Sequence, residues 1–400
     1  MTMELAKHVL SPINRDSLLN AVSKRETLHL ARASPAYFDT LLTLDELDQW
    51  LDGRDHFFPA VQLTGAAMEL SVADYCDEQQ RIQPLQVIRL LREGATLIAS
   101  RAHRQFPGLR RLCQQLQLLT GWRSQANLYL TRQGHQGFNP HFDSHEVLVL
   151  QLQGAKQFRL YAGGRETPLV SEHFEPGLYP PGELLESITL QAGDTLYIPA
   201  GVMHDAVALD GADSLHVTIG LFPVCCADVL HEVIELATEQ DRRLRAMVSV
   251  DEGPFAPDIL EGVARQLAQL ATPERVAEAM ISVREQQLER GEQNSRGALS
   301  GSDPGHNLGA SAWVQVKSDQ VVELQETPAR RVLLGTGCWL EVAADDVATV
   351  RRLLSQGRLP ASAFAGMLQG GAQSPGNKLL QGLLECNMVE IIQAADHNQP

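Results

Sequence analysis

Long apolar runs are missing from this chain of 400 residues, and their absence argues against whole classes of protein. No stretch approaches the roughly eighteen consecutive apolar residues that indicate a membrane-spanning helix. The first residues, MTMELAKHVLSPINRD, contain no basic segment that leads into an apolar one, which argues against a secretory signal. We therefore expect a protein without a membrane partner.

Lysine and paired cysteines are also scarce. The six cysteines are scattered without a Cys-x-x-Cys pair, a pattern that predicts neither a disulfide framework nor a zinc cluster and fits a reducing cytoplasm. The formal net charge of −16 disfavours non-specific attraction to nucleic acid or anionic lipid, so we do not expect direct nucleic-acid binding. Lysine occurs at only five positions: Lys7, Lys24, Lys156, Lys317 and Lys378.

Hydrophobic periodicity separates a mixed, largely helical N-terminal part from a strand-rich middle. Apolar residues recur at helical spacing in 42–51, 83–100 and 107–122. From about 125 to 222 the pattern changes to short runs such as ANLYLT, EVLVLQLQG and KQFRLY, separated by Gly, Asp and Pro. Many short strands at this spacing predict a closed or sandwiched antiparallel barrel.

Beyond Pro223 the strand pattern stops. Residues 226–290 have helical periodicity, 291–310 are rich in Gly, Ser and Asn like a linker, and 311–400 mix strand-like and helix-like segments. A chain of this length exceeds one typical domain. We place the domains at 1–224, 225–300 and 301–400.

The strand-rich middle contains a candidate metal site. His141 and Asp143 open a strand-like run two residues apart, so both side chains would point to one face. His204 ends a second segment, GDTLYIPAGVMH, and would meet them if the strands face each other across a barrel. Two imidazoles and one carboxylate leave open positions that suit Fe(II) with a bidentate 2-oxo acid and O₂, although the same donors also bind zinc, manganese or nickel.

Both motifs also have simpler interpretations. A His-x-Asp triplet occurs by chance, and His204 could be a half-buried histidine whose neighbours satisfy it. Asp143 argues against chance, because a carboxylate that points into a barrel is costly unless it is paired or bound to a metal.

Lys156 is the next candidate, at the start of the following strand. It would share one face with Phe158 and Leu160, and an inward lysine among apolar neighbours needs an anion. The distal carboxylate of a dicarboxylic co-substrate would serve. The alternative is an exposed lysine beside a turn, which is the usual position of this residue type.

Three segments carry a resemblance to a known family: NLYLTRQGHQGFNPHFDSHEVLVLQLQGAKQFRLY, GDTLYIPAGVMHDAV and SLHVTIGL. Over roughly residues 10 to 225 the chain resembles the Jumonji-C (cupin-like) ribosomal oxygenases, which are Fe(II)- and 2-oxoglutarate-dependent protein hydroxylases. The resemblance implies the α+β class: a double-stranded β-helix (jelly-roll or cupin) barrel with flanking helices, a helical dimerisation segment and a C-terminal winged-helix-like domain.

The resemblance also implies roles for individual residues. His141, Asp143 and His204 would bind the iron, and Lys156 would hold the C5 carboxylate of 2-oxoglutarate. Barrel lining without function is the alternative for the remaining candidates, and for Thr131 we favour that alternative. These further candidates for the co-substrate and substrate pocket are Asn127, Tyr129, Thr131 and His216.

The implied partners are a protein or peptide substrate, for which the family's own examples are a His or an Arg of a ribosomal protein, and a second copy of the chain bound through 225–300. Residues 311–400 hold seven Lys and Arg against nine acidic residues, so we expect a scaffold or protein-contact module there rather than a DNA-binding domain. The alternatives are an oxygenase that acts on a biosynthetic peptide, nucleic acid or methyl-lysine, and a non-catalytic metal-binding cupin or regulator.

Overall fold

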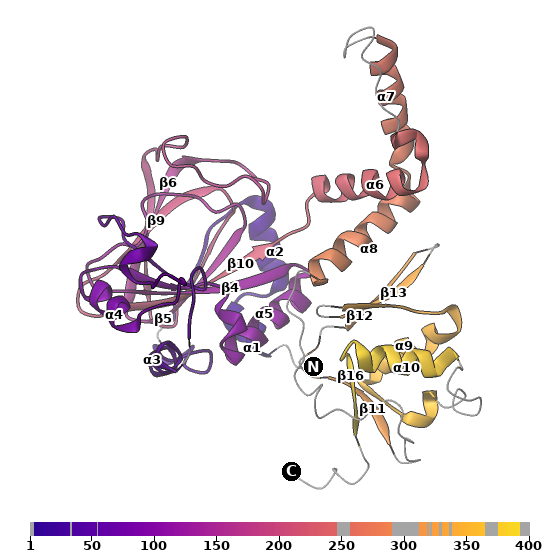
Figure 1. Cartoon of the computed structure of the whole chain (residues 1–400), viewed down its shortest axis with the longest axis horizontal. Coiled ribbons are helices and arrows are strands. Elements are labelled where there is room, and N and C mark those ends of the chain that lie inside the picture. Colours follow the sequence, from indigo (N-terminus) through magenta and orange to yellow (C-terminus); the bar gives the residue numbers. More distant parts are fainter. Residues whose placement is uncertain are drawn as a thin grey trace. The chain divides into compact units, whose positions relative to one another are not determined.

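The chain forms two compact units, Thr2–Pro223 and Val224–Pro400, in the computed structural model (Figure 1). The predicted linker over 291–310 lies outside the described residues. None of the helices that the structure describes is both long and apolar enough to cross a membrane. The described residues are 4–32, 34–53, 55–245, 257–289, 312–317, 320, 322–327, 330–335, 338–364 and 375–392.

The first unit combines short strands with helices, most of which precede the barrel in the chain. Its helices are α1 (Glu4–Leu10), α2 (Arg15–Lys24), α3 (Leu44–Asp52), α4 (Pro84–Arg92) and α5 (Pro107–Thr120), with single turns η1 (Val72–Asp74) and η2 (Ala102–Arg104). Its strands are β1 (Leu28–Leu30), β2 (Val61–Thr64), β3 (Thr96–Ala99), β4 (Arg123–Thr131), β5 (Glu146–Gln153), β6 (Ala155–Gly164), β7 (Leu184–Gln191), β8 (Thr195–Ile198), β9 (Val202–Ala208) and β10 (Ser214–Phe222).

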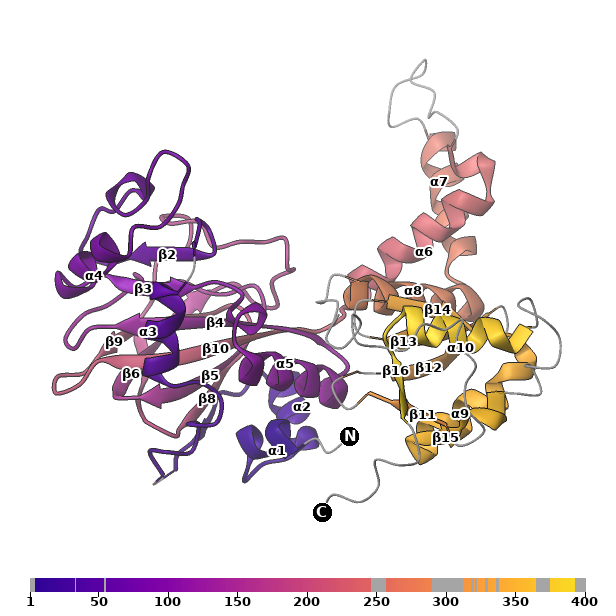
Figure 2. The same ribbon diagram turned by 60° about the horizontal axis from the view of Figure 1, so that its bottom comes forward.

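These strands form two antiparallel sheets that enclose a barrel of the cupin type. The larger sheet has the order β1-β8-β5-β10-β4-β3-β2, and the smaller has β7-β6-β9 (Figures 1 and 2). A bridge between His141 and His204 continues the smaller sheet beyond β9. The arrangement confirms the predicted double-stranded β-helix with flanking helices.

Strand β5 lies between two cores, which explains its composition. Val147 and Val149 pack inside the barrel in a cluster with residues of β6, β7 and β8. Leu148 and Leu150 belong to a second cluster, which includes residues of α1 and α5 on the outside of the larger sheet. A strand that is buried on both faces has a continuous apolar run instead of alternation. The run EVLVLQLQ is therefore a consequence of the helices that cover this sheet.

The prediction of one helical stretch over 83–100 is wrong in its second half. Helix α4 ends at Arg92, and Gly94 follows with a φ of 107°, a backbone conformation that favours glycine. Thr96–Ala99 then forms β3, which pairs with β2 and β4 and is buried throughout. Periodicity cannot separate so short an apolar run from a buried helical segment.

The second unit begins with helices α6 (Cys226–Gln240), α7 (Pro257–Leu270) and α8 (Pro273–Glu289). Two three-stranded sheets follow, with the orders β15-β11-β16 and β12-β13-β14. The remaining elements are η3 (Arg242–Arg245), β11 (Trp313–Val316), β12 (Val322–Glu326), β13 (Arg331–Gly335), β14 (Cys338–Glu341), η4 (Ala344–Asp346), α9 (Val347–Gln356), β15 (Arg358–Pro360), η5 (Ala361–Phe364), α10 (Pro375–Glu385) and β16 (Val389–Ile392).

The segment NKLLQGLLECNMVEI near the C-terminus has a helix-like apolar pattern, but it covers two elements. Helix α10 ends at Glu385, and β16 completes a sheet by pairing with β11. A core of buried residues from both sheets, α9 and α10 holds this part together. The winged-helix-like domain, the dimerisation segment and the domain boundaries at 224 and 300 stay predictions.

Candidate metal centre and adjoining cavity

Three side chains from two segments of the first unit meet at one site. One potential ligand atom from each of His141, Asp143 and His204 lies within 4.8 Å of the other two. His204 Nε2 is 3.7 Å from an Asp143 carboxylate oxygen, and the two imidazole ring centres are 4.7 Å apart. Backbone hydrogen bonds fix the pair, since the amide of each histidine donates to the carbonyl of the other at 2.7 and 2.9 Å.

The tautomers of both histidines suit metal binding. Nδ1 of His141 lies 2.9 Å from the carbonyl of Asn139, and Nδ1 of His204 lies 2.9 Å from the carbonyl of Val202. A carbonyl oxygen only accepts hydrogen bonds, so each Nδ1 carries the proton. Each Nε2 then keeps its lone pair for a metal ion, in the way that backbone partners orient metal-bound histidines.

The charge states at neutral pH also fit a ligand set. Burial, followed by the neighbouring His141, lowers the pKa of His204 to about 4, which leaves this imidazole neutral. Burial opposes ionisation of Asp143, but the histidines His145, His204 and His141 outweigh it and lower the pKa of the carboxyl group. A neutral imidazole and an ionised carboxylate are the forms that bind metal ions.

A cavity of about 290 Å³ adjoins the three candidate ligands. Apolar and aromatic side chains form part of its wall, and polar groups from five strands (β3, β4, β6, β9 and β10) also line it. Its lining residues are Thr96, Tyr129, Gly137, Phe138, His141, Asp143, Val147, Val149, Lys156, Phe158, His204, Ala206, His216 and Thr218.

Lys156 lies inside the barrel and not on its surface. Its side chain is buried with the residue 4% exposed, which excludes the exposed-lysine interpretation. Nζ donates a hydrogen bond to Thr131 Oγ1 at 3.1 Å, and Thr131 in turn contacts Thr96 Oγ1 at 3.0 Å. Within the described part of the chain no carboxylate lies at ion-pair distance from Lys156. Burial therefore lowers the pKa of the ammonium group to about 7.

His216 is the second buried polar group on the wall of this cavity. Its ring stacks on Tyr129 with 4.8 Å between centres and 8° between planes, and Phe158 contacts it edge-on at 6.1 Å. Burial and then Lys156 lower the pKa of the imidazole well below its ordinary value. Nδ1 is buried and has no hydrogen-bond partner among the described residues. A buried polar atom of this kind is rare unless a ligand satisfies it.

The structure separates the predicted pocket residues into two groups. Lys156, Tyr129 and His216 line the cavity, whereas Asn127 and Thr131 do not. Asn127 Oδ1 instead accepts a hydrogen bond from the backbone amide of Arg101 at 2.9 Å. The functional roles that the resemblance implies for all these residues stay predictions.

The sequence did not lead us to several of the residues that line the cavity. The two-residue period of a strand could have revealed Val147 and Val149, because both lie an even number of positions after Asp143 and share the inner face of β5. Ala206 follows His204 by two positions on β9 and could have been found in the same way. Thr96 carried no local signal, since only the pairing of β3 with β4 brings it to the cavity.

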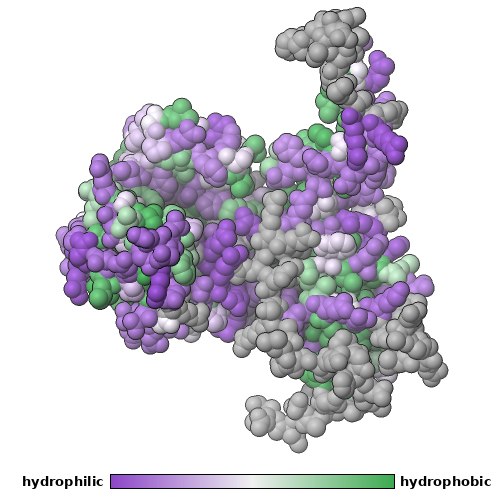
Figure 3. Space-filling view, in the orientation of Figure 1, coloured by the Kyte–Doolittle hydropathy of each residue, from purple (hydrophilic) through white to green (hydrophobic). Residues whose placement is uncertain are grey.

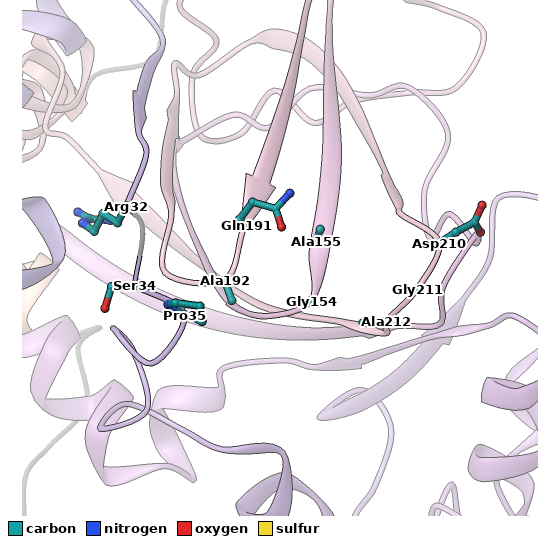
Figure 4. Close-up of a pocket in the computed structure, with 10 residues that line it drawn as sticks. All are labelled: Arg32, Ser34, Pro35, Gly154, Ala155, Gln191, Ala192, Asp210, Gly211 and Ala212. Atoms are coloured by element: carbon teal, nitrogen blue, oxygen red, sulfur yellow. The ribbon is translucent and has the colours of Figure 1, made fainter.

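A second hollow lies among turns of the same unit, and its chemistry is different (Figure 4). It is lined by residues after β1, the β5–β6 turn, the end of β7 and the β9–β10 turn. The guanidinium group of Arg32 is already engaged, because it donates to the carbonyls of Gly193 and Val9 at 2.9 and 2.8 Å. No metal-ligand cluster adjoins this hollow among the described residues.

Sequence comparison finds related proteins. Residues 101–229 match the JmjC domain family. The chain is 30% identical over 217 residues to the bifunctional lysine-specific demethylase and histidyl-hydroxylase NO66 of Drosophila willistoni, which covers 54% of this chain and 28% of that protein. It is 28% identical over 256 residues to ribosomal oxygenase 1 of Gallus gallus, which covers 62% and 42%. The chain thus spans less than half the length of these curated relatives.

Solved structures share the fold over a longer range. The crystal structure of Escherichia coli ycfD covers 95% of this chain and 99% of its own, with a TM-score of 0.58 and 15% identity. A structure of the ribosomal oxygenase YcfD in complex with cobalt and 2-oxoglutarate covers 95% and 98%, with a TM-score of 0.53 and 14% identity. At this identity the likeness concerns the fold alone.

Proposed function

We propose that this chain, whose residues 101–229 match the JmjC domain family, is an Fe(II)- and 2-oxoglutarate-dependent oxygenase. Its substrate would be a side chain of a protein. The observation that carries the proposal is one cavity with a two-histidine, one-carboxylate centre at its wall and an unpaired buried lysine in the same lining.

The cavity has the chemistry that a dicarboxylic keto acid requires. His141, Asp143 and His204 would hold iron and leave positions for the keto acid and O₂. Lys156 is a buried cation in the cavity lining without a carboxylate partner among the described residues, so it would receive the distal carboxylate. His216 Nδ1 offers one further polar contact within the same lining.

The chemistry supplied by iron, 2-oxoglutarate and O₂ when bound is oxidative decarboxylation of the keto acid to succinate, with transfer of one oxygen atom into a substrate C–H bond. The protein's own residues would bind and orient these groups. The carbonyls of Asn139 and Val202 hold the two imidazoles in the tautomer that presents Nε2. Val147, Val149 and Phe158 exclude water from the inner end of the cavity.

The substrate and partners follow from the relatives' names and the sequence. Ribosomal oxygenase 1 and YcfD carry names that point to ribosomal proteins, and we propose a histidine or arginine of a ribosomal protein as the target. We further propose a cytoplasmic homodimer that forms through 225–300. Residues 301–400 would be a winged-helix-like module for protein contacts.

Turnover of 2-oxoglutarate tests this function. Protein purified without oxygen is supplied with Fe(II), 2-oxoglutarate and air, and succinate is measured with and without total ribosomal protein. We expect succinate in both cases and more of it with ribosomal protein. One ribosomal protein should gain the mass of a single oxygen atom, and that mass increase should be missing from a host that lacks this chain.

Variants of two candidate metal ligands and of a histidine outside the cavity provide the control. Asp143→Ala and His204→Ala should abolish succinate formation, whereas His135→Ala should retain it because His135 is exposed and does not line the cavity. If the unmodified protein neither binds 2-oxoglutarate nor forms succinate, the oxygenase proposal is wrong and a metal-binding regulator takes its place.

A further inference from the structure

The connection between β6 and β7 forms a long strap around the metal centre. We define the strap as residues 165–187, which comprise the loop after β6 and the first four residues of β7. The loop folds back on the end of β6, since the amide of Ala162 donates to the carbonyl of Glu183 at 2.9 Å. The strap thus begins and ends at the rim of the smaller sheet.

The strap contacts the surroundings of all three metal ligands. Its Arg165 amide donates to the carbonyl of Gly201, three residues before His204, at 3.1 Å. Ser144, which follows Asp143, donates its hydroxyl to the carbonyl of Val170 at 3.2 Å.

The third contact involves a ligand itself. The Phe174 ring lies 6.3 Å from the ring of His141. Phe142 packs beneath the strap, with its ring 5.4 Å from that of Phe174 and 5.1 Å from that of Tyr179. The strap therefore lies beside His141, although none of its residues lines the cavity.

The strap exposes more large apolar side chains than the rest of this unit does. On the face shown in Figure 3, apolar residues of this unit mostly appear among hydrophilic ones. Of the eight large apolar side chains described as exposed in this unit, five lie in the strap. They are Leu169, Val170, Leu178, Leu184 and Leu185, at 41 to 62% exposure.

The start of β7 lacks cover on both of its faces. Residues alternate between the faces of a strand, yet Leu184, Leu185, Glu186 and Ser187 are all exposed. β7 is also the outer strand of the smaller sheet, and in the described structure only β6 pairs with it. An uncovered apolar edge of this kind is a site where an extended segment can bind.

The charge of the strap indicates which class of molecule can bind to it. It contains five glutamates, a single arginine and no lysine. The arginine, Arg165, is engaged in an ion pair with Glu172 inside the strap. An acidic surface disfavours a second copy of this acidic chain and nucleic acid, and it attracts a basic polypeptide.

We propose that the strap is the docking surface for an extended, basic segment of the protein substrate that also carries apolar side chains. The inference rests on the proposed oxygenase function and names the surface that would select the substrate. The strand register places this surface close to the metal centre. Glu186 of β7 pairs with Leu160 of β6, which pairs with His204 of β9, so the strap edge lies two strand spacings, about 10 Å, from a metal ligand.

Two strap variants and two matched controls test the proposal. Leu184→Ser/Leu185→Ser removes apolar surface, and Glu183→Lys/Glu186→Lys reverses charge. The controls are Leu85→Ser, which changes the most exposed leucine of this unit outside the strap, and Asp48→Lys/Glu78→Lys, which changes exposed acids elsewhere. None of these residues lines the cavity, so turnover of 2-oxoglutarate without substrate should stay unchanged.

The readouts separate docking from catalysis. The first is the anisotropy of a fluorescein-labelled peptide in which Arg and Lys alternate with Leu and Val around one His, compared with a peptide that carries Glu in place of Arg and Lys. The second is succinate formation against the concentration of total ribosomal protein. We expect each strap variant to weaken peptide binding and to raise the KM for ribosomal protein by about tenfold, with kcat little changed.

Each outcome supports or overturns the proposal. Equal effects of strap and control variants, or no effect of the strap variants in a wild-type protein that binds the peptide and forms succinate, would overturn the docking surface. Peptide binding that depends on the strap without any succinate would overturn the proposed oxygenase function but support the docking surface. If the Leu184→Ser/Leu185→Ser variant instead dissociates an oligomer in sedimentation analysis and leaves peptide binding intact, the occupant is a second copy and the proposal is wrong.

Discussion

Lys156 illustrates how a single residue can be costly for the fold and useful for the site. A lysine is rarely buried without a carboxylate partner, because removal of the ammonium group from water is expensive. Here the alcohol oxygen of Thr131 provides one hydrogen bond and no charge. The low pKa of about 7 is the consequence, and an anion in the cavity would restore the charged form.

The affinity for 2-oxoglutarate should depend on pH through Lys156. Below pH 7 the ammonium form is already present in the free protein, so the Kd should be nearly constant. Above pH 7 binding must be accompanied by proton uptake, and the Kd should rise towards tenfold per pH unit. Between pH 6.5 and 8.5 we expect a rise of roughly 25-fold, measured by calorimetry with Fe(II) in the absence of oxygen.

Lys156→Arg is the matched control for this measurement. The guanidinium group remains charged across the whole pH range, so the variant should show a much flatter dependence of Kd on pH. Equal slopes for the wild type and the variant would mean that another group controls the pH dependence.

At the scale of elements, helix α8 joins the helical and the sheet-containing parts of the second unit. Ile281 of α8 is buried against Val332 and Leu334 of β13. Two ion pairs support this contact. Arg330, directly before β13, pairs with Glu285 of α8 at 2.8 Å, and a second ion pair joins α8 to β12 at 3.4 Å. Helix α8 and the sheet β12-β13-β14 should therefore unfold together.

Substitution on α8 tests this coupling. Ile281→Ala should destabilise the second unit by about 2–4 kcal/mol, because it removes buried apolar atoms and leaves a cavity. Met280→Ala on the same helix should cost less than about 0.5 kcal/mol, since Met280 is 58% exposed. The measurement is a urea titration followed by hydrogen exchange of peptides from β13. Equal, small effects of both variants would show that α8 and the sheet are independent.

The same comparison bears on the domain boundaries. The sequence suggested a break near residue 300, where Gly, Ser and Asn accumulate. Contacts between α8 and β13 cross that position, and a local composition cannot report them.

At the scale of the whole molecule, the two units should unfold separately and respond differently to ligands. Calorimetry should resolve two transitions, and Mn²⁺ with 2-oxoglutarate should raise only that of Thr2–Pro223, which contains the three candidate metal ligands. Ligand at about 100 times its Kd should add about 2.7 kcal/mol to the stability of that unit.

Two variants assign these transitions. Asp143→Ala should remove the ligand-dependent shift, and Ile281→Ala should lower the other transition. If both transitions move together with ligand, the units unfold as one cooperative body and the separation is wrong.

Local features of the sequence were sufficient to predict the barrel and to single out His141, Asp143 and His204, which the structure brings together. The alternation along 125–222 and the two-residue spacing of His141 and Asp143 depend only on the geometry of an extended chain. For the same reason, short apolar runs such as 96–99 were ambiguous.

The tertiary structure alone decided what surrounds those ligands. Thr96 reaches the cavity because β3 pairs with β4, and Lys156 acquires its low pKa because strands distant in sequence bury it. Likewise, only the contacts of the strap with Gly201 and His141 show that it lies beside the metal centre. Pairing and burial depend on segments that are far apart along the chain, and no local pattern specifies which of them will meet.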